Sequence, residues 1–224
     1  MSGATYLVRG AVILAVLLAV VLGYRIGTRA NARLRLALDA AVRTASHDEL
    51  TGLPNRRALR QRLAVLTASR SEIVLAIVNL DRFSAVNELG HRIGDQLLVH
   101  HAGQLRYHAA QAGGTAYRLG LDGFAIVWPA AADNAETLVN MLLDALRDPV
   151  ELLVHNHPVV ARVTTSAGVI TLTGSGFGDQ TSLLLSRANT ALQHAKRTAR
   201  GTAVHWQPQM PRLLRPQRAD RATG

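Results

Sequence analysis

The sequence contains no cysteine, and this absence removes several chemistries at once. Disulfide bonds, thiolate metal sites and cysteine nucleophiles are all excluded. The histidines do not compensate, because the pairs His100–His101 and His155–His157 lack the spacings that mark a zinc site. No arrangement of a nucleophile with a histidine and an acid is visible either. A zinc enzyme or an enzyme with a covalent nucleophile is therefore not expected.

Acidic residues are also scarce, with 15 Asp and Glu against 25 Lys and Arg, and the formal net charge is +10. The surplus lies at the two ends. Residues 1–47 hold six Arg and one Asp, and residues 205–224 hold four Arg and one Asp. Residues 48–204 hold 15 basic and 13 acidic side chains and are nearly neutral. A nucleic-acid-binding domain concentrates positive charge on its folded body, so the sequence argues against a nucleic acid as partner.

Residues 10–24 contain no charged side chain, and the apolar stretch extends over residues 6–26 with only Arg9 and Arg25 inside it. A bilayer span needs about 20 residues, so this stretch is long enough with its flanks. The arginines that follow it predict that the C-terminal side faces the cytoplasm. We expect residues 1–28 to be a single-pass anchor in the inner or plasma membrane. The alternative is a signal peptide cleaved near residues 30–32, but its positive charge would precede the apolar run.

Residues 29–47 contain no glycine or proline and predict a helical linker. Small and apolar residues recur there at spacings of four, three and four, as in the seam of a parallel dimer. They are Leu34, Leu38, Ala41 and Ala45. A solvated connector is the alternative, because two heptads are too few to exclude it. At the other end, residues 207–224 combine proline with arginine and lack apolar periodicity, which predicts a disordered basic tail.

Residues 48–206 alternate helix-like and strand-like runs, as one folded domain does. Pro54 and Asn55 mark a helix start, and the Asp-Gly pair in "GLDG" indicates a hairpin. The expected strands are 72–80, 115–119, 124–128 and 159–172, and the expected later helices are 93–110, 134–147 and 180–198. This order predicts a mixed α/β sheet with helices packed on it.

Four segments resemble, in order and spacing, the GGDEF family of diguanylate cyclases, which join two GTP molecules into cyclic di-GMP. They are "DELTGLPNRR" (48–57), "NLDRFSAVNELGHRIGD" (79–95), "RLGLDGF" (118–124) and "SRANTALQHAKRTARG" (186–201). Together they span nearly all of the predicted domain. The resemblance implies an α/β (α+β) fold with a central, mainly antiparallel sheet flanked by helices, related to nucleotidyl cyclases and polymerase palms.

The family's reaction needs Mg²⁺, which neutralises charge on the triphosphate and takes oxygen ligands. The resemblance places the metal ligands at Asn79, the carbonyl of Leu80 and Asp122, with Asp81 as a possible substitute. Asn79 offers a neutral oxygen where the family has a carboxylate. We expect this change to cost several kcal/mol of metal affinity or transition-state stabilisation.

The signature itself reads Gly120, Leu121, Asp122, Gly123, Phe124 where the family has Gly, Gly, Asp or Glu, Glu, Phe. Leu121 replaces a glycine that lets the turn tighten, so it either carries about 1 to 3 kcal/mol of strain or shifts the turn. Asp122 and Gly123 could centre a type I′ turn by themselves. The glutamate implicated in catalysis is absent at Gly123. No catalytic residue is therefore expected intact.

The nucleotide-binding positions are better preserved. The family's guanine contacts correspond to Asn87 and Asp95, which can hydrogen-bond a base edge, although the turn between them is one residue short. Lys196 and Arg200 match the family's phosphate-binding pair and share one helical face. Without the resemblance, that pair reads as the solvated end of a helix.

The family's product-inhibition site is an R-x-x-D motif, and its two charged positions correspond to Gln111 and Gly114. Because neither charge is present, we do not expect cyclic di-GMP to bind there.

The sequence favours a membrane-anchored, cytoplasmic GGDEF-type domain that has lost, or nearly lost, cyclase activity and acts as a binding or scaffold module. It would bind GTP or another guanine nucleotide, with Mg²⁺ as cofactor if that binding is retained, and pair with a second copy or an active cyclase. Two alternatives stay open. One is an atypical active cyclase that uses Asp81 and Asp122 for Mg²⁺, and the other is a structural partner without nucleotide affinity.

Overall fold

The computed structural model describes residues 22–25, 28, 31, 42–129, 134–154, 157–172 and 181–211. The chain forms two compact units, residues 1–45 and 46–224. None of the helices within the described ranges is long and apolar enough to cross a membrane. Most of the expected anchor, three of the four linker seam positions and residues 212–224 of the expected tail lie outside those ranges.

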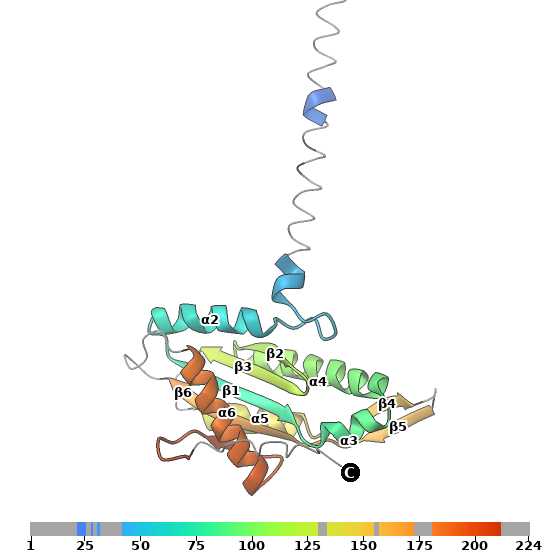
Figure 1. The fold of residues 1–224 in the computed structure, drawn as a ribbon, viewed down its shortest axis with the longest axis vertical. Coiled ribbons are helices and arrows are strands. Elements are labelled where there is room, and N and C mark those ends of the chain that lie inside the picture. Colours follow the sequence, from blue (N-terminus) through green and yellow to red (C-terminus); the bar gives the residue numbers. More distant parts are fainter. Residues whose placement is uncertain are drawn as a thin grey trace, which may run out of the picture. The chain divides into compact units, whose positions relative to one another are not determined.

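The second unit is built on a five-stranded sheet with the order β2-β3-β1-β6-β7 (Figure 1). All neighbouring pairs are antiparallel except β6 with β7, which confirms the expected mainly antiparallel sheet. The strands are β1 Ile73–Leu80, β2 Thr115–Gly120, β3 Gly123–Pro129, β6 Thr165–Leu172 and β7 Ala203–His205. A separate two-stranded sheet pairs β4 Val150–Val154 with β5 His157–Ala161.

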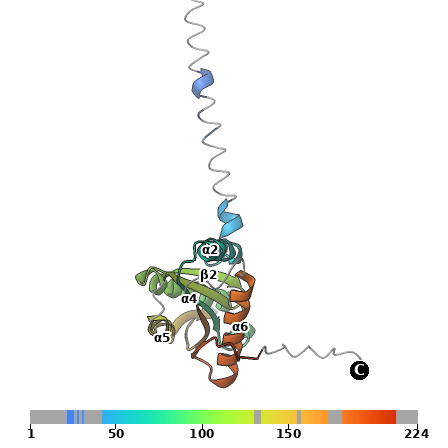
Figure 2. The same cartoon turned by 90° about the vertical axis from the view of Figure 1, so that its left-hand side faces the viewer.

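Helices cover both faces of the central sheet. They are α2 Arg56–Ala68, α3 Phe83–Glu88, α4 His91–Gln111, α5 Ala135–Ala145 and α6 Thr181–Thr198. Alternate residues of β1 point to opposite layers, as strand geometry requires. Val74 and Val78 pack with α4 and α5, whereas Leu75 and Ile77 pack with α2 and α6. Figure 2 shows α4 and α5 on one side of the sheet and α6 on the other.

Most elements lie where the sequence places them. Asn55 caps α2 by accepting hydrogen bonds from the backbone N–H groups of Arg57 and Ala58, as the Pro-Asn start predicts. β1 is central and buried on both faces. α4 begins two residues earlier than expected, at His91, and the short helix α3 precedes it.

The expected strand over residues 159–172 is wrong, because two strands in different sheets occupy this stretch. β5 pairs with β4, and β6 pairs with β1 and β7. Arg162, Val163 and Thr164 connect them. Two of these three residues are β-branched, so the change of sheet leaves no break in the strand-like pattern. The start of the expected tail also differs, since Gln207 accepts a hydrogen bond from Met210 in a turn.

Candidate functional site

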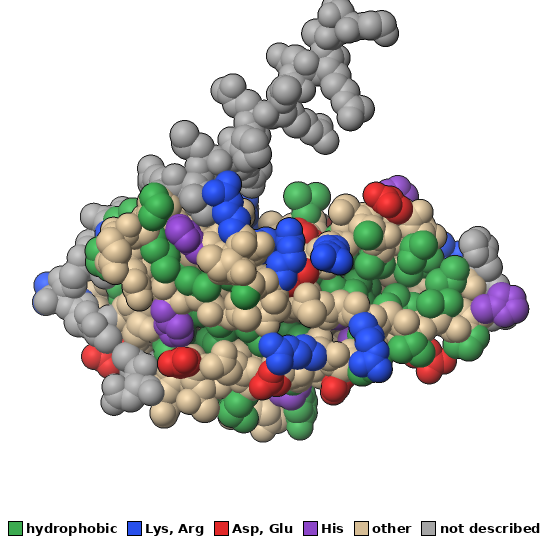
Figure 3. Space-filling model, turned by 90° about the horizontal axis from the view of Figure 1, so that it is seen from below, with side chains coloured by type: hydrophobic (Ala, Val, Ile, Leu, Met, Phe, Trp, Pro, Cys, Tyr) green, Lys and Arg blue, Asp and Glu red, His purple; other side chains and the backbone are tan. Residues whose placement is uncertain are grey.

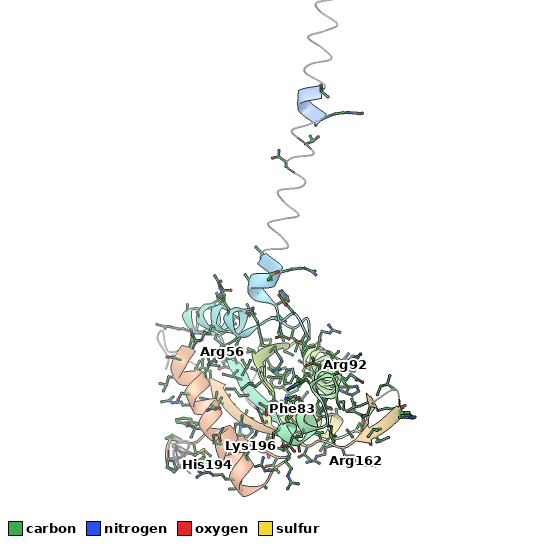
Figure 4. The ribbon with its side chains drawn as sticks, turned by 45° about the vertical axis from the view of Figure 1, so that its right-hand side comes forward. Arg56, Phe83, Arg92, Arg162, His194 and Lys196 are labelled. Atoms are coloured by element: carbon green, nitrogen blue, oxygen red, sulfur yellow. The ribbon has the colours of Figure 1, made fainter. Side chains whose placement is uncertain are left out.

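Four segments distant in sequence meet at one end of the central sheet. Asn79, near the end of β1, is paired with Gly123 at the start of β3 and with Ser166 near the start of β6. The β2–β3 turn follows directly from the first pairing. The end of α6 reaches the same place through Lys196, as Figure 4 shows. The signature turn and the expected phosphate-binding helix therefore meet at the end of β1.

A chain of hydrogen bonds joins three of the predicted site residues. The Nζ of Lys196 donates to Oδ1 of Asn79, and Nδ2 of Asn79 donates to Oδ1 of Asp122 at 2.6 Å. The backbone N–H of Leu80 donates to the carbonyl of Asp122 at 3.2 Å. An amide can accept from a cation and donate to an anion at once, whereas a carboxylate cannot donate. Asn79 therefore links Lys196 directly to Asp122.

The Lys196 ammonium lies in a mixed electrostatic environment. Burial lowers its pKa, and the positive charge of Arg200 adds to that shift, while the carboxylates of Asp122 and Asp81 oppose it. The two carboxylates thus favour the charged form of Lys196 against the cost of burial. Basic and acidic side chains also stand close together near the middle of the face shown in Figure 3.

Asp81 is buried, and other groups of the protein hold both of its carboxylate oxygens. The hydroxyl of Ser166 donates to both oxygens at 2.9 Å, and the hydroxyl of Thr164 donates to Oδ2 at 2.9 Å. The backbone N–H of Gly201 donates to Oδ2 at 3.0 Å, and Arg200 forms an ion pair with Oδ1 at 3.5 Å. These bonds occupy the acceptor positions of the carboxylate. Asp81 therefore fixes the turn after α6 to the sheet, and to act as the possible metal ligand it would have to give up some of these bonds.

The β2–β3 turn differs from the expected type I′ turn. Gly120 pairs with Gly123, so Leu121 and Asp122 are its two central residues. Leu121 has φ +50°, and Asp122 has no positive φ. A type I′ turn needs positive φ at both central positions. The turn has therefore not shifted onto Asp122 and Gly123, and Leu121 adopts a backbone conformation that favours glycine.

Arg118, which holds this turn in place, was not among the site residues predicted from the sequence. Its guanidinium donates to the carbonyl of Gly123 at 2.7 Å and to the carbonyl of Leu121, and it lies 4.7 Å from the ring centre of Phe124. The residue is buried, and burial lowers its pKa. Its place in a strand beside the signature was the only signal in the sequence. Leu121 is held by this arginine although its own side chain is 88% exposed.

The two expected guanine contacts lie at the α3–α4 corner, but their side chains have different neighbours. The Asn87 side chain lies over Gly94, and its Oδ1 is 2.1 Å from where a β-carbon on Gly94 would be. Asp95 is exposed and lines a cleft of about 1230 Å³ between the start of α4 and the strand β4. Within the described part of the chain, no hydrogen bond joins Asn87 or Asp95 to Lys196.

Gly114, one of the two product-inhibition positions, is covered by Trp128. A β-carbon at Gly114 would lie 2.4 Å from Cδ1 of the Trp128 indole. An aspartate could not occupy this position without moving the indole, which is fully buried. The local packing therefore disfavours the family's R-x-x-D arrangement in this chain.

The residues at the end of β1 do not suit Mg²⁺, which needs several hard oxygen ligands. One oxygen of Asp122 accepts from Asn79, both oxygens of Asp81 are engaged, and a lysine ammonium contacts Asn79. Across the residues that the structure describes, no group of three or more His, Asp or Glu side chains could hold a metal ion. The groups around Asn79 are therefore one carboxylate, of Asp122, and one ammonium, of Lys196.

Comparison with known proteins agrees with this fold. The family described as "Diguanylate cyclase, GGDEF domain" matches residues 45–202. The chain is 35% identical over 159 residues to the diguanylate cyclase DgcP of Pseudomonas aeruginosa, covering 68% of this chain and 23% of that protein. It is 37% identical over 168 residues to an uncharacterised protein of Mycobacterium tuberculosis, covering 72% and 26%. The chain thus spans about a quarter of these relatives.

Solved structures give the same result. The coiled coil and GGDEF domain of DgcB from Caulobacter crescentus, in complex with cyclic di-GMP, matches with a TM-score of 0.72 and 27% identity, covering 80% of this chain and 95% of that one. The diguanylate cyclase SiaD from Pseudomonas aeruginosa, in complex with its activator SiaC, matches with a TM-score of 0.65 and 27% identity, covering 90% and 77%. The chain belongs to the GGDEF domain family of cyclic di-GMP signalling.

Proposed function

We propose that this domain does not synthesise cyclic di-GMP and acts in that signalling system by binding a guanine nucleotide and a protein partner. The observation that carries the proposal is the hydrogen-bonded chain from Lys196 through Asn79 to Asp122. Phosphoryl transfer between two GTP molecules needs divalent cations to neutralise the developing charge. Here an amide and an ammonium stand beside the one signature carboxylate.

The signature turn supports the same proposal. Gly123 has no side chain where the family has its catalytic glutamate, so no acid or base can act from this position. Leu121 places an exposed apolar side chain where the family has a second glycine. A nucleotide approaching the turn would meet this side chain instead of bare backbone.

Nucleotide binding is the retained part of the proposal. Lys196 lies in the last turn of α6 and Arg200 in the turn directly after the helix, and both offer charged donors for phosphate oxygens. Asn87 and Asp95 remain as polar groups at the α3–α4 corner for a base edge. Guanine should then be preferred over adenine, because only guanine presents both a carbonyl acceptor and amino and imino donors to such a pair.

The partner and the location are also proposals. We place the domain on the cytoplasmic side of the membrane, held by the apolar stretch at residues 6–26, with a second copy or an active cyclase as partner. The DgcB structure includes a coiled coil before its GGDEF domain, and SiaD is bound to an activator protein. The seam that begins at Leu34 supports pairing of this kind.

One experiment separates this proposal from its two alternatives. The purified full chain is incubated with GTP and Mg²⁺, the product is measured by mass spectrometry, and the unfolding temperature is measured with rising GTP. We expect no cyclic di-GMP and a higher unfolding temperature, since ligand at 100 times its dissociation constant adds about 2.7 kcal/mol. Product formation would establish the atypical cyclase. If GTP gives no product and does not raise the unfolding temperature, the domain is a structural partner without nucleotide affinity.

A variant with the family's residues restored tests whether the altered residues 79, 121 and 123 account for the loss of activity. Asn79→Asp, Leu121→Gly and Gly123→Glu together rebuild the family pattern around Asp122. We expect this triple variant to produce cyclic di-GMP if only those side chains are missing. The double variant without Asn79→Asp is the matched control and should remain inactive, because the metal site would still lack its second carboxylate.

A further inference from the structure

The charges at the end of β1 are balanced by the protein itself. Asp122 carries one negative charge, Lys196 carries one positive charge, and the Asn79 amide between them is neutral. Asp81 and Arg200 form a second pair beside them, with an N–O distance of 3.5 Å. A positive charge already lies near each carboxylate, Lys196 near Asp122 and Arg200 beside Asp81, and this reduces the attraction of the site for a divalent cation.

The identity of residue 79 decides whether a metal ion or the Lys196 ammonium lies beside it. A carboxylate at this position would face Asp122 with a like charge, and a metal ion between the two would relieve the repulsion. The Asn79 amide donates to Asp122 instead, at 2.6 Å, so no repulsion needs relief. Its oxygen is turned toward Lys196 and accepts from that ammonium. A metal ion at this oxygen would have to displace the Lys196 contact.

The two cations still have donors for a ligand. Lys196 has three N–H groups, one of which is directed to Asn79. Arg200 has five N–H groups and is 47% exposed, and its ion pair with Asp81 is long. The hydroxyls and backbone N–H that hold Asp81 keep that carboxylate satisfied if Arg200 turns toward a phosphate. The expected shared helical face is not formed, because α6 ends at Thr198, but Lys196 and Arg200 both lie near the Asp81 carboxylate.

We infer that this site binds the phosphate chain of a nucleoside triphosphate directly on Lys196 and Arg200, without a divalent cation. The inference rests on the nucleotide binding proposed above and adds the mode of phosphate neutralisation. The ammonium and the guanidinium supply the positive charge that Mg²⁺ supplies in a metal-dependent site. Free GTP carries more negative charge than its magnesium complex. It should therefore bind at least as tightly as that complex.

Calorimetric titration of the full chain with GTP tests the inference, once with excess EDTA and once with excess MgCl₂. We expect the dissociation constant in EDTA to be equal to or lower than that in Mg²⁺. A loss of about tenfold or more in EDTA would overturn the inference while leaving the proposed nucleotide binding intact. No binding in either buffer would refute the proposed nucleotide binding itself and the inference with it.

Two adjacent substitutions identify the cation. Lys196→Gln should weaken binding in EDTA by about tenfold or more, because a charge-assisted contact is lost. Arg197→Gln removes the same charge from the next position of α6, which is exposed, and should leave the affinity within about twofold. Unfolding temperatures verify that both variants are folded. Equal affinity for Lys196→Gln and the parent chain would overturn the assignment.

The substitution Asn79→Asp tests the role of the amide. We expect it to weaken GTP binding in EDTA by about tenfold, because a second carboxylate then faces the phosphates. Added Mg²⁺ should restore the affinity in this variant and have no such effect in the parent chain. If the variant binds GTP in EDTA as tightly as the parent chain, the amide does not set the metal requirement and the inference is wrong.

Discussion

At the scale of single residues, Leu121 shows how the signature turn keeps its shape without the family's glycine. Its φ of +50° is a conformation that a leucine seldom adopts, and its side chain is 88% exposed. The hydrogen bonds from Arg118 to the carbonyls of Leu121 and Gly123 hold the backbone there. The cost of the left-handed conformation is therefore offset by contacts from β2, the strand that leads into the turn.

Leu121→Gly should stabilise the domain. Glycine relieves the positive φ, and the exposed leucine gives up little buried area, so we expect a gain of about 1 kcal/mol. For a chain of this size, that gain raises the unfolding temperature by about 2 to 4 °C, measurable by calorimetry. Leu121→Ala keeps the β-carbon and should give no gain. An equal rise in both variants would show that loss of the apolar side chain, and not backbone strain, is the cause.

His101 connects stability to pH through burial. The residue is 1% exposed, its Nδ1 lies 3.0 Å from the Leu97 carbonyl, and burial lowers its pKa to about 4. The folded state therefore keeps this imidazole neutral, while the unfolded chain takes up a proton below about pH 6.5. Its contribution is complete above pH 6.5 and is lost as the pH falls toward 4, by about 3 kcal/mol in total.

The substitution His101→Leu should remove this pH dependence. Denaturant unfolding measured from pH 7 down to pH 4 is expected to show a shallower loss of stability in the variant than in the parent chain. His100→Leu is the matched control, because His100 is the exposed neighbour on the same helix. A parallel decline in His101→Leu and the parent chain would contradict the assignment of this effect to His101.

At the scale of elements, the position of α6 depends on the missing side chain of Gly168. A β-carbon at this position of β6 would lie 2.1 Å from the carbonyl oxygen of Ala188 and 2.2 Å from the backbone nitrogen of Leu192. Both atoms belong to the backbone of α6, so the helix as a whole would have to move. Lys196 lies in the last turn of this helix and Arg200 directly follows it, so the proposed phosphate site depends on the same close contact.

Gly168→Ala should destabilise the domain by about 1 to 3 kcal/mol and weaken GTP binding, because α6 is pushed from the sheet. The control is Gly103→Ala in the interior of α4, where no atom lies within 4 Å of the added carbon. That variant should gain about 0.5 to 1 kcal/mol from helix propensity and keep its GTP affinity. Denaturant unfolding and calorimetric titration of both variants check the pair. A stable Gly168→Ala variant with unchanged affinity would refute the tight-contact argument.

Local patterns were sufficient for the elements whose signals are local. The apolar run of β1, the Asp-Gly hairpin and the capped start of α2 all lie where the sequence places them. The strand β4 was not predicted, and the break between β5 and β6 was not found, because Val163 and Thr164 in the connection are themselves typical of strands. For the signature turn, the sequence left open whether Leu121 carries strain or the turn shifts, and the structure shows a positive φ at Leu121. Arg118 stabilises this conformation from β2, just before the turn, and no sequence pattern indicates that its guanidinium turns back to the carbonyls of Leu121 and Gly123.

The site shows the same division. The resemblance located Asn79, Asp122 and Lys196, and the structure brings these three together. It did not show that Asp81 is fully engaged by Ser166 and its neighbours, because a buried polar residue gains its partner only through the fold. Resemblance to a family therefore predicts which residues lie together in the site, whereas the role of each residue depends on its hydrogen bonds in the fold.

At the scale of the whole molecule, the uneven distribution of charge favours association with an anionic membrane surface. The nearly neutral domain lies between two basic ends, and the N-terminal one follows the apolar stretch directly. Arginines beside an apolar segment are attracted to anionic lipid headgroups, each by about 1 kcal/mol near the surface. A buried apolar span contributes much more than this electrostatic term and does not depend on salt. Membrane binding at high salt therefore distinguishes a chain anchored by an apolar span from one held only by electrostatic attraction to headgroups.

The full chain should float with vesicles that contain anionic lipid and stay with them at high salt. Salt screens exposed charges over a Debye length of about 3 Å at 1 M, so charge alone cannot hold the protein there. A chain that begins at residue 29 keeps most of the arginines and loses the apolar stretch, and we expect high salt to release it. Release of the full chain by salt would contradict the anchor. An N-terminus found near residue 33 in protein made in its host would instead establish the cleaved signal peptide.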